Sequence, residues 1–121
     1  MFRPFFAALL LTTALLLAST GAQALSLAEY QQGRSDPATR DSQDAYLFVA
    51  FQGMVWYGMA LKDAQPDAHG LYCLNGDQVP GEQDLASLIS AEATEAASGT
   101  DANVAMESVL IKALQRKFPC S

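Results

Sequence analysis

The sequence predicts an all-α protein: a small single domain of three to four helices around a buried central helix, closed by one disulfide. Three observations favour this class. Apolar residues recur at helical spacing over residues 41–64, 82–98 and 101–118. Glycine and proline separate these stretches, and the chain carries two cysteines. The central stretch has the aromatic content of a strand, but its length favours a helix.

The first 24 residues predict a secretory signal peptide. Arg3 provides the charged start, an apolar run follows from about Phe5 to Ala18, and Ala22-Gln23-Ala24 forms a small-residue cleavage site. The alternative is a retained membrane anchor, which needs roughly 20 apolar residues, more than this run provides. We therefore expect residues 1–24 to be removed and residues 25–121 to form an exported domain with no membrane span.

The charge balance argues against nucleic acid as a partner. Without Arg3, residues 25–121 hold six basic and 13 acidic residues, a formal charge of −7. A surface of this sign disfavours nucleic acid and anionic lipid and favours basic partners. Simple solubility explains the same excess of acids, so the charge alone identifies no function.

The two cysteines, Cys73 and Cys120, predict one disulfide, because paired thiols of an exported protein are usually oxidised. Closing a loop of this length constrains the unfolded chain by roughly 4 kcal/mol. The bond would also keep the last helix from fraying at the chain end. A free reactive pair and a metal site are the alternatives, but the chain has no CxxC motif and only one histidine.

Turn residues and helix caps predict where the first helices begin. A short helix is expected over residues 26–33, followed by a loop that contains Pro37. The helix over residues 41–64 is expected to start with Asp41 or Ser42 as its N-cap.

The helix over residues 41–64 is expected to be the most buried one, because it is apolar on nearly every side. Its aromatic residues, Trp56 and Tyr57 among them, are expected to pack in the core rather than to form a ligand-binding box. Gly53 and Gly58 each cost about 1 kcal/mol of helix propensity relative to alanine. They would make sense where a second helix comes close.

The second half of the chain predicts a connecting segment and two more helices. Residues 65–84 are rich in turn residues, with a brief extended piece around Cys73. Residues 82–98 form an amphipathic helix whose wet side would carry Glu92 and Glu95.

The last helix, over residues 101–118, is expected to be capped by its flanking residues. Gly99 is the expected left-handed residue that ends the preceding helix. Thr100 or Asp101 would cap the start of the last helix, and Pro119 would close it.

No group of residues predicts catalysis. The one histidine, His69, follows Asp63 and Asp67 in a D-x-x-x-D-x-H spacing, which matches no specific metal motif and is more typical of a solvated loop. No serine stands in a nucleophile-elbow pattern, and no glycine-rich loop suits phosphate. We therefore expect no enzyme, no metal site and no cofactor.

The motif A-x-x-x-V-L-I-K-A-L-x-x-x-F-P-C, from Ala105 to Cys120, resembles the C-terminal signature of the Rap/Tai family of type VI secretion amidase immunity proteins. The pair Tyr72-Cys73, shortly before Val79, Gln83 and Leu85, is similar to the family's connecting segment. Gly53 stands where the family has a glycine-containing helix, so the resemblance covers residues 46–120. It departs from the family pattern at Asn75, where a proline is usual, so the chain looks like a divergent member.

The resemblance implies a periplasmic protein that binds a peptidoglycan amidase toxin and blocks its active site. The expected contact surface is the polar loop that carries Asp63, Asp67, His69 and Asp77, whose acids would meet a basic rim around the amidase cleft. A solvated linker is the alternative for that loop. For the protein as a whole, a periplasmic stress chaperone and an envelope accessory protein are the alternatives, and a homodimer stays open.

Overall fold

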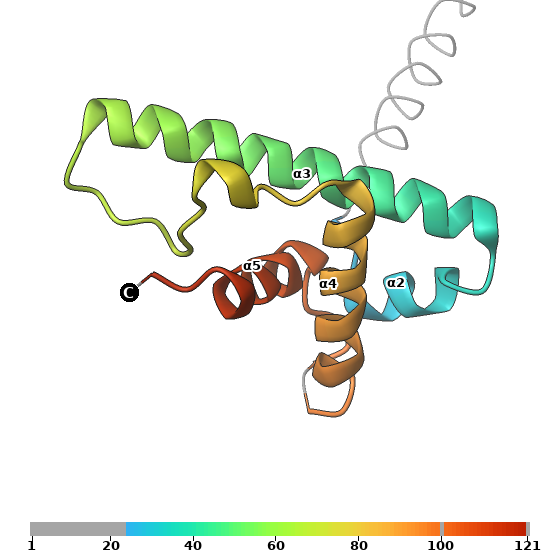
Figure 1. The fold of residues 1–121 in the computed structure, drawn as a ribbon. Coiled ribbons are helices and arrows are strands. Elements are labelled where there is room, and N and C mark those ends of the chain that lie inside the picture. The colour runs from blue at the N-terminus through green and yellow to red at the C-terminus, as the bar shows by residue number, and fades with distance from the viewer. Residues whose placement is uncertain (1–23, 100, 121) are drawn as a thin grey trace, which may run out of the picture.

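The computed structural model describes residues 24–99 and 101–120, and within them it confirms the all-α prediction. Four α-helices follow in order: α2 (Leu27–Gly33), α3 (Pro37–Ala64), α4 (Glu82–Ala96) and α5 (Met106–Lys117), with a short 3₁₀ helix η1 (Gly76–Gln78) before α4 (Figure 1). These residues form no strand, only an isolated antiparallel bridge between Ser26 and Ala105. The predicted signal peptide, residues 1–24, lies outside the described residues except for Ala24.

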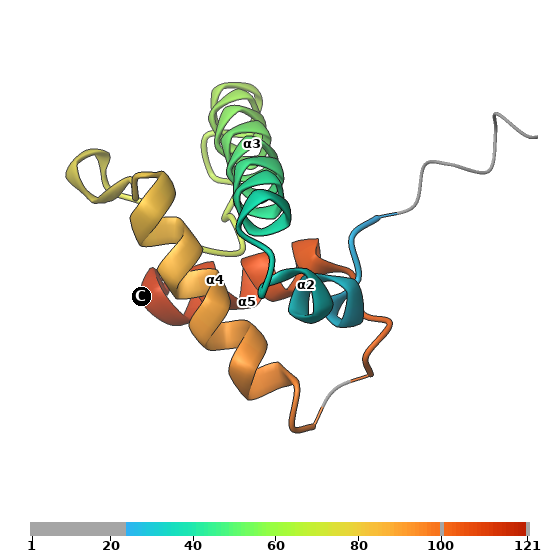
Figure 2. The same ribbon diagram turned by 90° about the vertical axis from the view of Figure 1, so that its right-hand side faces the viewer.

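The long helix α3 lies across the other three helices. In both ribbon views α2, α4 and α5 lie to one side of it, with α2 close to its first turns (Figures 1 and 2). The most extensive contact between two helices joins α4 and α5. The far end of α3 reaches beyond this group, and the connector, residues 65–81, returns beneath it to α4 (Figure 1).

The core is centred on α5. Its Met106, Leu110 and Leu114 have no exposed surface. They recur at intervals of four residues, so they share one face of the helix. The other helices each add one apolar face to this centre. The core residues are Leu27, Tyr30, Leu47, Phe51, Leu85, Ile89, Ala93, Met106, Val109, Leu110 and Leu114.

The prediction that residues 41–64 form the most buried helix is therefore wrong. Only Gln43, Leu47 and Phe51 of α3 are buried, whereas Trp56 and Tyr57 are each 70% exposed. The reason is geometric, because α3 is about 42 Å long at 1.5 Å per residue and meets its shorter neighbours along one side only. Its last turns extend beyond them, so no helix covers Trp56 and Tyr57.

The glycines of α3 do not mark a close helix contact, contrary to expectation. A Cβ atom added at Gly53 or Gly58 would have no neighbouring atom within 4 Å. The close approach is instead at Gly33, the last residue of α2. A Cβ atom there would overlap Nε2 of Gln43 and lie 2.7 Å from Cγ2 of Thr39, so glycine lets the first turns of α3 pack against the end of α2.

The start of α3 lies five residues before the expected one. Asp36 is the N-cap, its carboxylate accepts hydrogen bonds from the backbone N–H and the hydroxyl of Thr39, and Pro37 occupies the first helical turn. These hydrogen bonds hold the pKa of Asp36 below its ordinary value. The sequence predicts Pro37 in a loop. Proline nevertheless suits the first turn of a helix, because the N–H that it lacks would have no partner there. Asp41 and Ser42 therefore lie inside the helix.

The start of α5 also differs from the prediction. Asp101 accepts a hydrogen bond from the backbone N–H of Asn103 in the preceding loop, and Thr100 lies outside the described residues. α5 begins at Met106, whose N–H donates to the carbonyl of Leu25 at 2.8 Å. The Leu25 carbonyl thus accepts a hydrogen bond from the first turn of α5, where a side-chain cap was expected. Gly99 has no positive φ, so α4 ends without the left-handed residue that was expected.

Glu92 was expected on the wet side of its helix, but it is only 7% exposed. Its Oε2 lies 3.3 Å from Nε of Arg116 on α5, and Arg116 also pairs with the exposed Glu95. A buried carboxylate needs such a partner, because desolvation penalises its charge. The α4–α5 pair is therefore fastened by this ion pair beside its apolar face.

Within residues 24–99 and 101–120, no helix combines the length and the apolarity that crossing a bilayer requires.

The two glycine environments predict opposite effects of the same substitution. Gly33→Ala should lower the free energy of unfolding by about 1–3 kcal/mol, because Gln43 is buried and cannot move aside freely. Gly53→Ala should raise it by about 0.4–1 kcal/mol, because alanine is the better helix former and nothing obstructs its Cβ atom. Urea denaturation of both variants measures these changes. Destabilisation by Gly53→Ala would contradict the exposed position of that residue.

Candidate functional site

The connector is fastened to the end of α5 by a covalent bond and a backbone hydrogen bond. Cys73 and Cys120 form the predicted disulfide, and the N–H of Cys73 donates to the carbonyl of Phe118 at 2.8 Å. On either side of Cys73, Tyr72 and Leu74 pack against the core, and burial raises the pKa of Tyr72 above its ordinary value. The middle of the connector is therefore held in place, while most of its other side chains face solvent.

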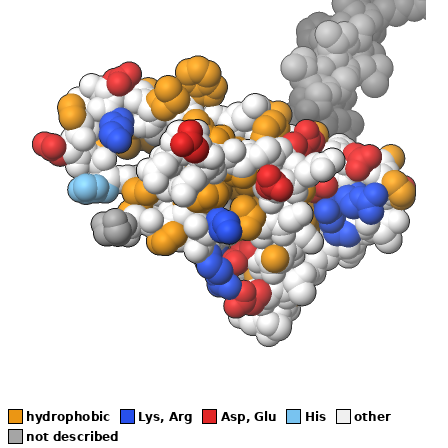
Figure 3. All heavy atoms as spheres, in the orientation of Figure 1, with side chains coloured by type: hydrophobic (Ala, Val, Ile, Leu, Met, Phe, Trp, Pro, Cys, Tyr) orange, Lys and Arg blue, Asp and Glu red, His pale blue; other side chains and the backbone are white. Residues whose placement is uncertain are grey.

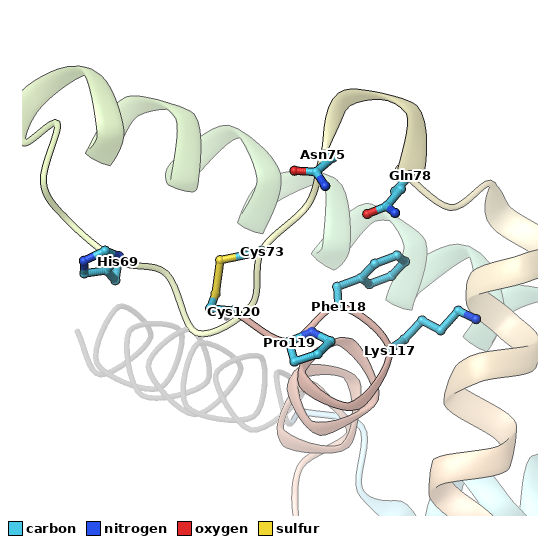
Figure 4. A pocket seen from close by; sticks show the side chains of 8 residues that line it. All are labelled: His69, Cys73, Asn75, Gln78, Lys117, Phe118, Pro119 and Cys120. Carbon is cyan, nitrogen blue, oxygen red and sulfur yellow. A yellow bond between two sulfur atoms is a disulfide. The ribbon is translucent and has the colours of Figure 1, made fainter.

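A hollow of about 370 Å³ lies between the connector and the C-terminal segment (Figure 4). Asn75 and Gln78 reach into the space above the Phe118 ring, whereas the Lys117 side chain extends away and His69 lies beyond the disulfide (Figure 4). None of the described residues that line this hollow carries a carboxylate or a free thiol. Its lining residues are His69, Cys73, Asn75, Gln78, Lys117, Phe118, Pro119 and Cys120.

The residues that line the hollow offer hydrogen-bonding groups and apolar surface. Amide groups donate and accept hydrogen bonds, and the Phe118 and Pro119 rings offer apolar surface. A nucleophile or a general base would need a partner within hydrogen-bonding distance, and no such bond is found between the lining side chains. Among the residues that the structure describes, no three His, Cys, Asp or Glu side chains gather as metal ligands would.

The residues predicted to bind a partner do not form one cluster. Asp63 is in the last turn of α3, Asp67 and His69 are in the connector, and Asp77 is in η1. All four side chains are exposed, and His69 is the one member that lines the hollow. Figure 3 shows the histidine on the surface at one end of the molecule, where separate acidic side chains are also exposed.

Sequence reasoning missed the apolar part of this surface. Trp56, Tyr57 and Met59, which we call the α3 tip, are each more than half exposed, as is Leu71 of the connector, and Val79 is half exposed. Figure 3 shows hydrophobic side chains at this end of the molecule among acidic ones. Exposed tryptophan and tyrosine are typical of protein interfaces, where they supply much of the binding energy. The cluster of aromatic residues in α3 could have indicated this surface. Their helical spacing instead led to the prediction that they pack in the core.

No protein-family model, no curated protein and no solved structure matches this chain. The resemblance to the immunity proteins, carried by residues 105–120 and the connector, therefore stays a prediction.

The disulfide should contribute strongly to the stability of this small domain. Cys120→Ser should lower the free energy of unfolding by roughly 2–5 kcal/mol, as loss of a native disulfide does in small secreted domains. Cys73→Ser and the double variant should lose the same amount, because each removes the same bond. Urea denaturation with and without reductant tests this. An additive loss in the double variant would show that the two cysteines contribute separately.

Proposed function

We propose that the chain is a periplasmic immunity-type protein that binds a peptidoglycan amidase toxin of type VI secretion and inhibits it. The observation that carries this proposal is the exposed apolar α3 tip beside a connector that the Cys73–Cys120 disulfide holds in place. The resemblance of residues 105–120 to the immunity family names the class of partner.

The fastening of the connector favours tight binding. A loop that is ordered only on binding loses conformational entropy at that moment, which weakens the complex. Here the disulfide and the hydrogen bond from Cys73 to Phe118 restrict the connector beforehand. Binding residues are often carried on loops that a rigid scaffold holds in this way.

The chemistry of the surface favours a basic protein partner. Trp56 and Tyr57 provide large apolar contacts, and Asp63, Asp67 and Asp77 are exposed on the segments that follow them in the chain, the last turn of α3, the connector and η1. Acidic groups at the rim accelerate association with a basic surface and add little to the strength of the final complex. A partner with a positively charged rim around an active-site cleft fits this arrangement, and inhibition would follow from covering the cleft.

A periplasmic stress chaperone is the second candidate, and the exposed α3 tip also favours it, because chaperones bind unfolded proteins through apolar surface. The two functions differ in specificity. A chaperone should prevent the aggregation of several unrelated proteins at low pH, whereas an immunity protein should bind one folded enzyme.

The proposal predicts capture of a folded amidase in a pulldown with candidate periplasmic peptidoglycan amidases. Asp67→Lys and Asp77→Lys should slow association and flatten its dependence on salt, because both charges lie at the rim. Trp56→Ala should raise the dissociation rate at least tenfold, as the loss of an interface tryptophan usually does. Asp41→Lys is the matched control, because Asp41 is equally exposed but lies in the first half of α3.

Two outcomes would contradict the immunity function. The first is that no amidase is captured at micromolar concentration. The second is that Asp41→Lys slows association as much as the variants of the connector do. Suppression of aggregation at low pH without capture of an enzyme would favour the chaperone function instead.

A further inference from the structure

A second groove lies between α2 and the first half of α3, away from the α3 tip. Its volume is about 670 Å³, and none of the described residues that line it is a lysine, an arginine or a histidine. Glu29 lines it from α2, and Thr39, Ser42, Gln43 and Tyr46 line it from α3. Among these side chains the Glu29 carboxylate only accepts hydrogen bonds, and the hydroxyl and amide groups can accept as well as donate.

Two acceptors beside this groove have no partner. Gln43 is 7% exposed, and its Nε2 donates to the carbonyl of Glu29 at 3.2 Å, but its Oε1 is buried without a hydrogen bond from any described residue. The Tyr46 hydroxyl donates to Oε1 of Glu107 on α5, and Oε2 of the same carboxylate is likewise buried and unpaired. Buried acceptors without donors are costly, so these two mark a place where a donor is missing.

Another set of residues on α2 and α3, together with Arg34, shows how such a site is filled. There the guanidinium of Arg34 lies 4.6 Å from the centre of the Tyr30 ring, and its Nη1 is 2.6 Å from Oδ1 of Asp44. A tyrosine ring and a carboxylate together hold one organic cation in that place. Tyr46, which lines the groove, and Glu107, to which its hydroxyl donates, repeat this combination, but no cation of the described residues pairs with Glu107.

We propose that this groove binds an organic cation, a guanidinium or a primary ammonium group. Glu29 supplies the charge, the 44% exposed ring of Tyr46 supplies an aromatic face, and Gln43 supplies an acceptor. Two sources carry this chemistry. One is an arginine or lysine side chain of a partner, and the other is the ammonium group that removal of residues 1–24 would leave on Leu25, which itself lines the groove. The inference does not depend on the proposed immunity function.

Nuclear magnetic resonance titration with arginine methyl ester and with butylammonium tests the proposal. The signals of the Gln43 side-chain amide and of the Tyr46 ring should shift and saturate, with a dissociation constant on the order of 1 mM. Glu29→Gln should weaken binding about tenfold, because it removes the charge, while glutamine can still close the capping box with Ser26. Glu82→Gln on α4 is the control and should change nothing, because Glu82 is exposed and does not line the groove.

Comparison of the full chain with the form that begins at Leu25 identifies the source of the cation. Binding of the probes by both forms assigns the groove to an external side chain. Binding by the full chain alone means that the Leu25 ammonium fills the groove after leader removal. The proposal is overturned if neither form shows a saturable shift up to about 50 mM probe, well above the expected dissociation constant. It is also overturned if Glu29→Gln binds as well as the unchanged protein.

Discussion

The disulfide between Cys73 and Cys120 is the constraint on which the functional surface depends. The apolar core ends near the last turn of α5, and the connector adds Tyr72 and Leu74 to its border and buries Pro80. The small apolar area that the connector buries offsets little of the conformational entropy that is lost when a long loop becomes ordered. The covalent bond restricts the same loop in the unfolded chain, and the backbone hydrogen bond from Cys73 to Phe118 fixes where it lies.

The length of α3 has the second large effect on this molecule. Its N-terminal part packs on α2, α4 and α5 through Leu47 and Phe51, and its last turns, from Trp56 on, extend beyond them. The same helix thus contributes to the core at one end and presents Trp56 and Tyr57 to solvent at the other. The connector begins where this exposed end stops, so the apolar side chains and the acidic loop come to the same end of the molecule (Figure 1).

The sequence alone predicted the helical class and the approximate position of each described helix, because these follow from the local spacing of apolar residues. It also predicted the disulfide, because the chain has only two cysteines. It did not predict which helix is buried, since a run of apolar residues is the same whether neighbours cover one side or all sides. Glu92 shows the same limit, because only the position of Arg116 explains its burial. The hollow was missed for a related reason: Asn75 and Gln78 meet Phe118 only after the disulfide has brought two distant segments together.

The central claim is that the connector is ordered before any partner is present, and amide hydrogen exchange of the protein alone tests it most directly. In the oxidised protein the Cys73 amide should exchange slowly, because it is bonded to the Phe118 carbonyl. After reduction of the disulfide it should exchange much faster, while the amide of Leu110 in the core stays protected. Rapid exchange of the Cys73 amide in the oxidised protein would contradict the account.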